Sequence, residues 1–298
     1  MSSKNEPRLT KAQRTAEARE KAKVIREAQL KKEKRNAWLI RGGVLAAAVA
    51  IIVIIALVVI NTNKANEPVA STGPVPASMN SFGGVTVGKD AVVIPPATPA
   101  SNVDMAKLPP APSAAPTAVA DPEAIGIKAS ASGEPAQVVI YLDFMCPACN
   151  NFEKTNGAQI DQLREAGKIT VEYRPLNFLD RFSSGTNYSS RSAAAAACVA
   201  ETSPDKYKAY LDTLFVNQPA ENSKGLDNAK LMKLATDAGA ADISSCVDAK
   251  TYRPLVAYAS SLATISGINA TPTVFIDGQQ WKEGAFPTFI EGILSAKK

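Results

Sequence analysis

Residues 137–149 read QVVIYLDFMCPAC, and this stretch decides the fold. The first eight residues are almost continuously apolar, which is typical of a strand buried on both faces of a sheet. A Cys-Pro-Ala-Cys motif follows at once, and residues 147–167 predict a helix. We therefore expect a buried strand, a tight turn and a helix whose first turn carries both cysteines.

This placement suits Cys146 and Cys149 to thiol–disulfide exchange. The thiolate is the attacking form, so the nucleophile needs a depressed pKa. The unpaired N–H groups and the macrodipole at a helix N-terminus provide that shift. Pro147 fits the first helical turn because its missing N–H would have no partner there. We predict that Cys146 is the nucleophile and that Cys149, one turn deeper, is the resolving thiol.

Two other uses of a Cys-x-x-Cys pair compete with this one. A zinc site needs four ligands, and the remaining two would have to be Cys198 and Cys246, which form no second Cys-x-x-Cys. The other alternative is a purely structural disulfide between residues 146 and 149. The strand–turn–helix setting favours redox chemistry over both.

The elements further along the chain predict an α/β fold. Residues 169–173 (ITVEY) and 273–277 (TVFID) have the composition of strands, and residues 287–296 that of a terminal helix. Between the two strands, residues 189–267 are mostly helical in pattern. The expected architecture is an α/β sandwich over residues 122–298 with a helical subdomain inserted about 189–267.

The N-terminal part has three segments. Residues 1–37 are expected to form a basic tail. Residues 38–60 predict a transmembrane helix, because the run 42–60 (GGVLAAAVAIIVIIALVVI) carries no charge and has about the 20 residues that a membrane-spanning helix needs. Its length, and the long basic region before it, favour an anchor over a cleaved signal peptide. Residues 61–122 hold eleven of the twenty prolines, so 61–121 predict a linker, with 82–94 (FGGVTVGKDAVVI) a candidate hairpin joined to the domain.

Charge and composition set the topology and exclude several chemistries. Residues 1–41 carry 13 Lys or Arg and 5 Glu, while the rest carries 20 basic and 23 acidic residues. The positive-inside rule then places the N-terminus in the cytoplasm and residues 61–298 outside. The body has no basic excess, so we expect no nucleic-acid partner. With no histidine in the chain, every His-dependent catalytic pair is excluded.

The quoted motif, the helical insertion and residues 267–278 (GINATPTVFIDG) together resemble the DsbA-type branch of the thioredoxin superfamily. The likeness covers 122–298 and is strongest to membrane-tethered extracytoplasmic DsbA-like proteins of actinobacteria. It implies a cis Thr271-Pro272 bond in a loop that faces the cysteines and binds an extended substrate strand.

The chain departs from that pattern at two positions. The best-known DsbA oxidases have histidine where this chain has Ala148, and that histidine helps to stabilise the thiolate. Thioredoxin relatives often carry a buried carboxylate six residues before the first cysteine, where this chain has Ile140. Asp143 is the nearest carboxylate in sequence. It is either a proton relay for the resolving thiol or a solvated turn residue.

Cys198 and Cys246 both fall in the helical insertion. An even cysteine count outside the cytoplasm favours pairing, so we predict a structural disulfide between them. Two free buried thiols and a second redox pair are the alternatives. The pairing would close a loop of about 49 residues and stabilise the fold by about 4 kcal/mol in the chain-entropy model.

These features together predict an extracytoplasmic thiol–disulfide oxidoreductase that oxidises the cysteines of exported proteins and needs no cofactor. The resemblance implies re-oxidation by a membrane partner, either DsbB-like or vitamin-K-epoxide-reductase-like, and residues 42–60 imply contact with the lipid bilayer. A reductase or isomerase using the same cysteines is the nearest alternative. A redox-silent peptide-binding scaffold is a third.

Overall fold

The computed structural model describes residues 68–297 except 115 and 117, together with eight helical residues between 19 and 32. The chain divides into two compact units, residues 1–63 and 64–298. Among the described residues, no helix is long and apolar enough to cross a membrane, and the predicted span 38–60 lies outside them. The following paragraphs concern the second unit.

A six-stranded sheet in the order β3-β2-β6-β5-β7-β8 forms the centre of this unit. β5 (Ala136–Leu142) lies in the middle, parallel to β6 (Ile169–Pro175) and antiparallel to β7 (Thr273–Ile276). β8 (Gln279–Trp281) completes the edge beside β7. Six of the seven β5 residues are buried, as the apolar run predicts for a strand covered on both faces.

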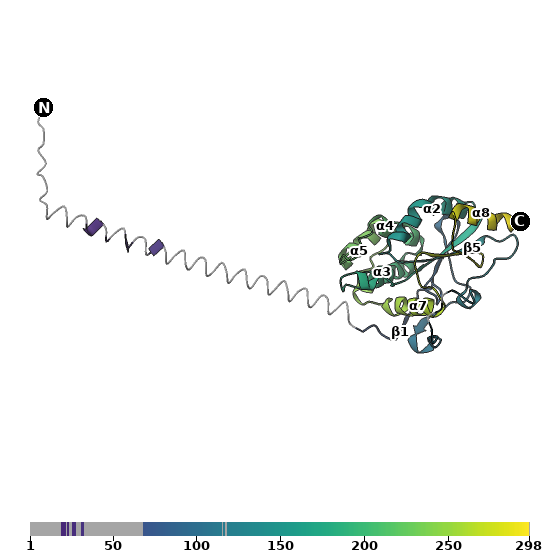
Figure 1. Ribbon diagram of the computed structural model, residues 1–298, viewed down its shortest axis with the longest axis horizontal. Coiled ribbons are helices and arrows are strands. Elements are labelled where there is room, and N and C mark those ends of the chain that lie inside the picture. Colours follow the sequence, from purple (N-terminus) through teal and green to yellow (C-terminus); the bar gives the residue numbers. More distant parts are fainter. Residues whose placement is uncertain are drawn as a thin grey trace, which may run out of the picture. The chain divides into compact units, whose positions relative to one another are not determined.

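Helices cover both faces of the sheet (Figure 1). Val138, Ile140 and Leu142 of β5 join the larger core cluster, whereas Val139 and Tyr141 join a second cluster on the opposite face. α2 (Pro147–Glu165) and α8 (Phe286–Ala296) contribute to the larger cluster, and α7 (Arg253–Ile265) contributes Ala263 to the second. The alternation along β5 thus divides the core into two layers.

The insertion between β6 and β7 is helical, as predicted. It comprises α3 (Tyr188–Thr202), α4 (Tyr207–Val216), α5 (Asn228–Asp237), α6 (Ser244–Asp248) and α7. The alanines of α3 are buried, since small side chains allow neighbouring helices to approach closely. Cys198 of α3 is bonded to Cys246 of α6. Short 3-10 turns lie at Asp180–Phe182 and Pro204–Lys206.

The segment expected as a linker differs from that expectation, because much of it packs on the domain. β1 (Thr72–Pro74) pairs with β4 (Asn102–Asp104), and both lie against α7. β2 (Val85–Val87) pairs with β3 (Val93–Ile94) in a hairpin within 82–94 and with β6 in the sheet. Three more 3-10 turns lie at Lys89–Ala91, Met105–Lys107 and Glu123–Ile125.

A buried ion pair explains why this segment adheres. Arg174 Nε donates to Glu172 Oε1 at 2.6 Å, and both side chains are almost fully buried in β6. Asn80 donates to the same Glu172 oxygen at 2.6 Å, and the ring of Phe82 covers the Arg174 guanidinium at 4.8 Å. A Cβ at Gly84 would collide with the Glu172 carboxylate, so only glycine fits there. The polar atoms need these partners once they leave water.

Candidate active site

Cys146 is the N-cap residue of α2, directly after the β5 strand and its turn. Its backbone is extended (φ −76°, ψ 114°), Pro147 occupies the first helical turn, and the Cys149 N–H points at Cys146 Sγ at 3.4 Å. The Cys146 N–H donates to the Asp143 carbonyl at 3.0 Å, which closes the turn. The local sequence therefore places the sulfur against the unpaired N–H groups of a helix N-terminus.

The two thiols, both free, differ sharply in acidity. Hydrogen bonds lower the pKa of Cys146 from 9.0 to about 6, although burial acts in the opposite direction. The hydrogen bond from the Cys149 thiol has the largest effect. Those from the Thr271 side chain and from the N–H groups of Cys149 and Ala148 follow. Burial raises the pKa of Cys149 well above its usual value. Cys146 is 6% exposed and Cys149 1% exposed. The partner thiol, more than the helix terminus that the sequence suggested, thus accounts for the acidity of Cys146.

The loop before β7 faces the cysteines. The Thr271–Pro272 peptide bond is cis, and the Thr271 carbonyl oxygen lies 3.2 Å from Cys146 Sγ, although 125 residues separate the two in sequence. Thr271 and Pro272 remain partly exposed, and Pro147 and Ala148 at the start of α2 are exposed. A substrate chain can therefore approach Cys146 between these two edges.

Asp143 is a buried residue, not a solvated turn residue. Its side chain accepts hydrogen bonds from the Met145 N–H at 2.8 Å, the Leu179 N–H at 2.9 Å and the Ser189 hydroxyl at 2.7 Å. Burial outweighs these bonds and raises its pKa to about 7. The Asp143 backbone also forms a hydrogen bond with Cys149. The carboxyl thus titrates near neutrality and ties the active-site turn to the loop after β6 and to α3.

Cys198 and Cys246 lie apart from this site, as a disulfide with an S–S distance of 2.03 Å. They are bonded to each other, so they are not available to complete a zinc site with Cys146 and Cys149. Ile140, six residues before Cys146, is 1% exposed and belongs to the core.

Gln218 is a further site residue, and no motif in the sequence points to it. It follows α4, and its Nε2 donates to the Cys146 carbonyl at 2.8 Å and to the Phe144 carbonyl at 3.1 Å. Its Oε1 accepts from Asn150 Nδ2 at 3.0 Å. A glutamine 72 residues from the nucleophile carries no motif, so only the folded chain brings it to the active-site turn.

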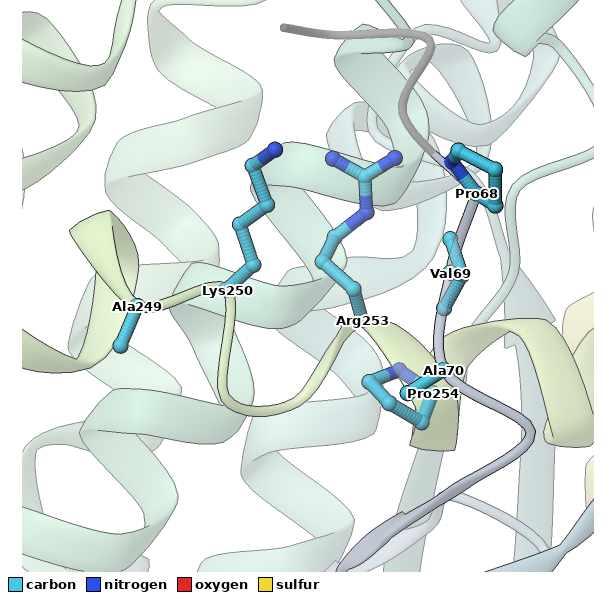
Figure 2. Close-up of a pocket in the computed structure, with 7 residues that line it drawn as sticks. All are labelled: Pro68, Val69, Ala70, Ala249, Lys250, Arg253 and Pro254. Atoms are coloured by element: carbon cyan, nitrogen blue, oxygen red, sulfur yellow. The ribbon is translucent and has the colours of Figure 1, made fainter.

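A cavity of about 190 Å³ lies away from the cysteines, at the start of α7 (Figure 2). Lys250 and Arg253 line it with their long side chains, and Pro68, Val69, Ala70, Ala249 and Pro254 complete it. None of the residues around Cys146 contributes to its wall, so this cavity is separate from the active site.

Comparisons with known proteins assign the family. A family model described as Thioredoxin matches residues 129–293, more than half of the chain. The reduced form of the disulfide bond oxidoreductase DsbG from Mycobacterium tuberculosis is 33% identical, with a TM-score of 0.50 over 57% of this chain and 83% of that one. This chain is a DsbA-type thiol–disulfide oxidoreductase of the thioredoxin superfamily.

Other relatives share the DsbA-type fold or part of the sequence. The MdbA thiol-disulfide oxidoreductase from Actinomyces oris is 18% identical with a TM-score of 0.51, covering 78% of this chain and 94% of its own. That likeness concerns the fold alone. The serine/threonine-protein kinase PknE of Mycobacterium tuberculosis H37Rv is 33% identical over 160 residues. The match takes 51% of this DsbA-type chain but only 28% of the kinase, so the chain spans little more than a quarter of that relative's length.

Proposed function

We propose that this DsbA-type protein oxidises the cysteines of exported proteins and that Cys146 is its nucleophile. The observation that carries the proposal is the contrast between the two thiols, with Cys146 at a pKa of about 6 and Cys149 far above its usual range. Stabilising the Cys146 thiolate stabilises the reduced form, which makes the disulfide a stronger oxidant. The same contrast argues against a reductase, whose reduced form must readily give up its electrons.

The proposed reaction begins with a Cys146–Cys149 disulfide. A substrate thiolate attacks Cys146 Sγ, the 146–149 bond breaks, and the electron pair leaves on Cys149, which takes up a proton. A second substrate thiolate then attacks the substrate sulfur held by Cys146, so the substrate gains a disulfide and Cys146 leaves as a thiolate. Because Cys146 has the lower pKa, it is the better leaving group in this second step.

We propose that the Asp143 carboxyl exchanges a proton with the Cys149 thiol. Its carboxyl has a pKa of about 7, and its backbone contacts the Cys149 thiol. A group that titrates near neutrality can deliver a proton in one direction of the reaction and accept it in the other. In this proposal Thr271 and Pro272 bind the substrate strand beside the sulfur, through backbone hydrogen bonds of the kind that add a strand.

We further propose that residues 38–60 anchor the protein in the plasma membrane with the catalytic domain outside the cytoplasm. The uncharged run 42–60 and the basic residues before it support this topology. A DsbB-like or vitamin-K-epoxide-reductase-like membrane protein would then re-oxidise the cysteines. Protease added to intact spheroplasts is expected to digest the domain and spare residues 1–37. Protection of the domain would contradict both the topology and the oxidase role.

A trapping experiment tests the reaction itself. In Cys149→Ala no 146–149 disulfide can form, so Cys146 enters by the reverse step: its thiolate attacks a disulfide of an exported protein, forms a mixed disulfide and releases the other substrate cysteine as a thiolate. Because Cys149 is missing and cannot resolve this bond, the adducts, which reductant releases, are expected to accumulate on Cys146. Cys146→Ala serves as the control and is expected to form none. A folded Cys149→Ala protein without adducts would remove Cys146 as the nucleophile and favour a scaffold.

The steady-state redox form separates the remaining alternatives. Alkylation of free thiols in cells should find the wild-type 146–149 pair mostly oxidised if the protein is an oxidase. A reductase or isomerase would be found mostly reduced. Pro272→Thr is expected to lengthen the life of the adducts, because the loop before β7 borders Cys146.

A further inference from the structure

We infer that Gln218 is a positioning residue for the nucleophile: its side-chain amide clamps the active-site turn from the helical insertion and holds Cys146 in register with the first turn of α2. The inference deepens the proposed function and rests on Cys146 being the reactive thiol. Gln218 touches no reacting atom, so it acts through the backbone that carries Cys146.

The clamp is built from three hydrogen bonds that use both ends of one amide. Nε2 donates to the Cys146 carbonyl at 2.8 Å and to the Phe144 carbonyl at 3.1 Å. Oε1 accepts from Asn150 Nδ2 at 3.0 Å, on the residue that follows the Cys-Pro-Ala-Cys motif. Because Nε2 must face the two carbonyls and Oε1 must face Asn150, the amide has one orientation in which all three bonds form.

These contacts span the turn on both sides of the sulfur. The Cys146 carbonyl also accepts the Asn150 N–H at 3.2 Å, the bond that begins α2. Gln218 therefore fixes the plane of the peptide group that joins Cys146 to Pro147. That plane sets how the N–H groups of Ala148 and Cys149 point at the sulfur, and both contribute to lowering the Cys146 pKa.

The position of Gln218 suits a link between the two parts of the domain. It lies two residues after Val216, the last residue of α4, whose side chain is 82% exposed and contributes nothing to the core. Phe215, one residue earlier, is 5% exposed and packs on Phe144 with ring centroids 5.3 Å apart. The Phe215–Phe144 contact thus anchors the end of α4 to the turn, and Gln218 adds directed hydrogen bonds to that apolar contact.

A purely structural tie would also join the insertion to the turn, so the test must read out the thiolate. The variant is Gln218→Met, which keeps length and volume but can form none of the three bonds. Asn217→Ala is the matched control, because Asn217 Nδ2 donates back to the Thr213 carbonyl, in the last turn of the helix that it follows, at 2.9 Å. Asn150→Ala is the second variant, since it removes the partner that orients the amide while leaving Gln218 in place.

The measurement is the thiolate absorbance at 240 nm and the rate of iodoacetamide alkylation of the reduced protein against pH. We expect Gln218→Met to raise the Cys146 midpoint by about half a pH unit, which makes alkylation below the midpoint about threefold slower. Asn150→Ala should move it in the same direction by less, and Asn217→Ala should superimpose on the wild type. Gln218→Glu should raise it further, because a carboxylate cannot donate to the carbonyls and adds negative charge near the thiolate.

The outcomes separate this inference from the proposed function. If the wild-type Cys146 titrates near its ordinary range, the proposed function fails before Gln218 is considered. If the wild type titrates near pH 6 and folded Gln218→Met and Asn150→Ala both superimpose on it, the proposed function stands and the clamp is overturned. A fall in melting temperature without any change in midpoint would likewise reduce Gln218 to a structural tie and overturn the inference.

Discussion

The pKa of Cys146 should depend mainly on its partner sulfur. The Cys149 thiol is the largest cause of the depressed value, ahead of the Thr271 side chain and the helix N–H groups. A hydrogen bond to a charged group is worth roughly 1.5–3 kcal/mol, which corresponds to about 1–2 pKa units. Starting from a pKa of about 6, we expect Cys149→Ala to move the Cys146 midpoint to about 7–8.

The consequence is large at neutral pH. At pH 7 a thiol with a pKa of about 6 is roughly nine-tenths ionised, whereas one at about 7–8 is roughly half to one-tenth ionised. Absorbance at 240 nm and alkylation rates against pH measure this directly in the reduced proteins. The raised pKa of Cys149 keeps it out of the wild-type titration below the alkaline range.

A matched substitution isolates the hydrogen bond. Cys149→Ser keeps a donor at the same place, so its midpoint should lie between those of the wild type and Cys149→Ala. If Cys149→Ala instead titrates near pH 6 like the wild type, the backbone N–H groups stabilise the thiolate and our assignment of the cause is wrong. If Ser and Ala behave alike, the effect comes from packing and not from the donated bond.

Three further predictions concern stability. The Cys198–Cys246 bond joins residues that are 48 positions apart in sequence. Without it, Cys198→Ala should lose about 4 kcal/mol of unfolding free energy, or roughly 8–16 °C in melting temperature, which calorimetry measures. Free thiols at both positions in protein isolated without reductant would contradict the structural disulfide. Glu172→Gln should cost about 3–5 kcal/mol in denaturant unfolding, because Arg174 would keep a buried charge without its counter-ion. Because burial raises the pKa of Asp143 to about 7, its stabilising contribution is complete below its ordinary pKa and is lost as pH rises through about 7. Asp143→Asn should therefore reduce the pH dependence of the melting temperature between about pH 4 and 7. A pH slope equal to that of the wild type would contradict the raised pKa of Asp143.

The sequence could predict the parts of the site whose causes are local. The apolar run before Cys146, the proline after it and the spacing of the two cysteines define a strand, a turn and a helix within 30 residues, and the structure has these elements close to their expected ends. Tertiary contacts determined the rest. Asp143 could be a solvated residue or a buried one on sequence grounds, and its three hydrogen-bond donors come from separate segments.

The N-terminal segment differed more, for the same physical reason, except at 82–94, where the candidate hairpin is present and joined to the sheet. Its prolines and small residues have the composition of a linker, because composition does not reveal a partner far along the chain. Val85 pairs with Tyr173, and Asn80 reaches Glu172, each across roughly 90 residues. Burying Glu172 and Arg174 in β6 creates a need for polar and aromatic cover, and this segment supplies it. Gln218 escaped detection in the same way.

The covering of β6 by β2 affects how the domain can be cut. The thioredoxin match begins at residue 129, so a chain shortened to start at 122 would retain all of that match and lose β2. The backbone groups of Val171 and Tyr173 that now pair with β2 would form an open edge. Arg174 beside them would lose the Phe82 ring that covers its guanidinium. An unprotected edge strand recruits strands from other copies. A chain truncated at boundaries drawn from sequence similarity is therefore expected to aggregate edge to edge.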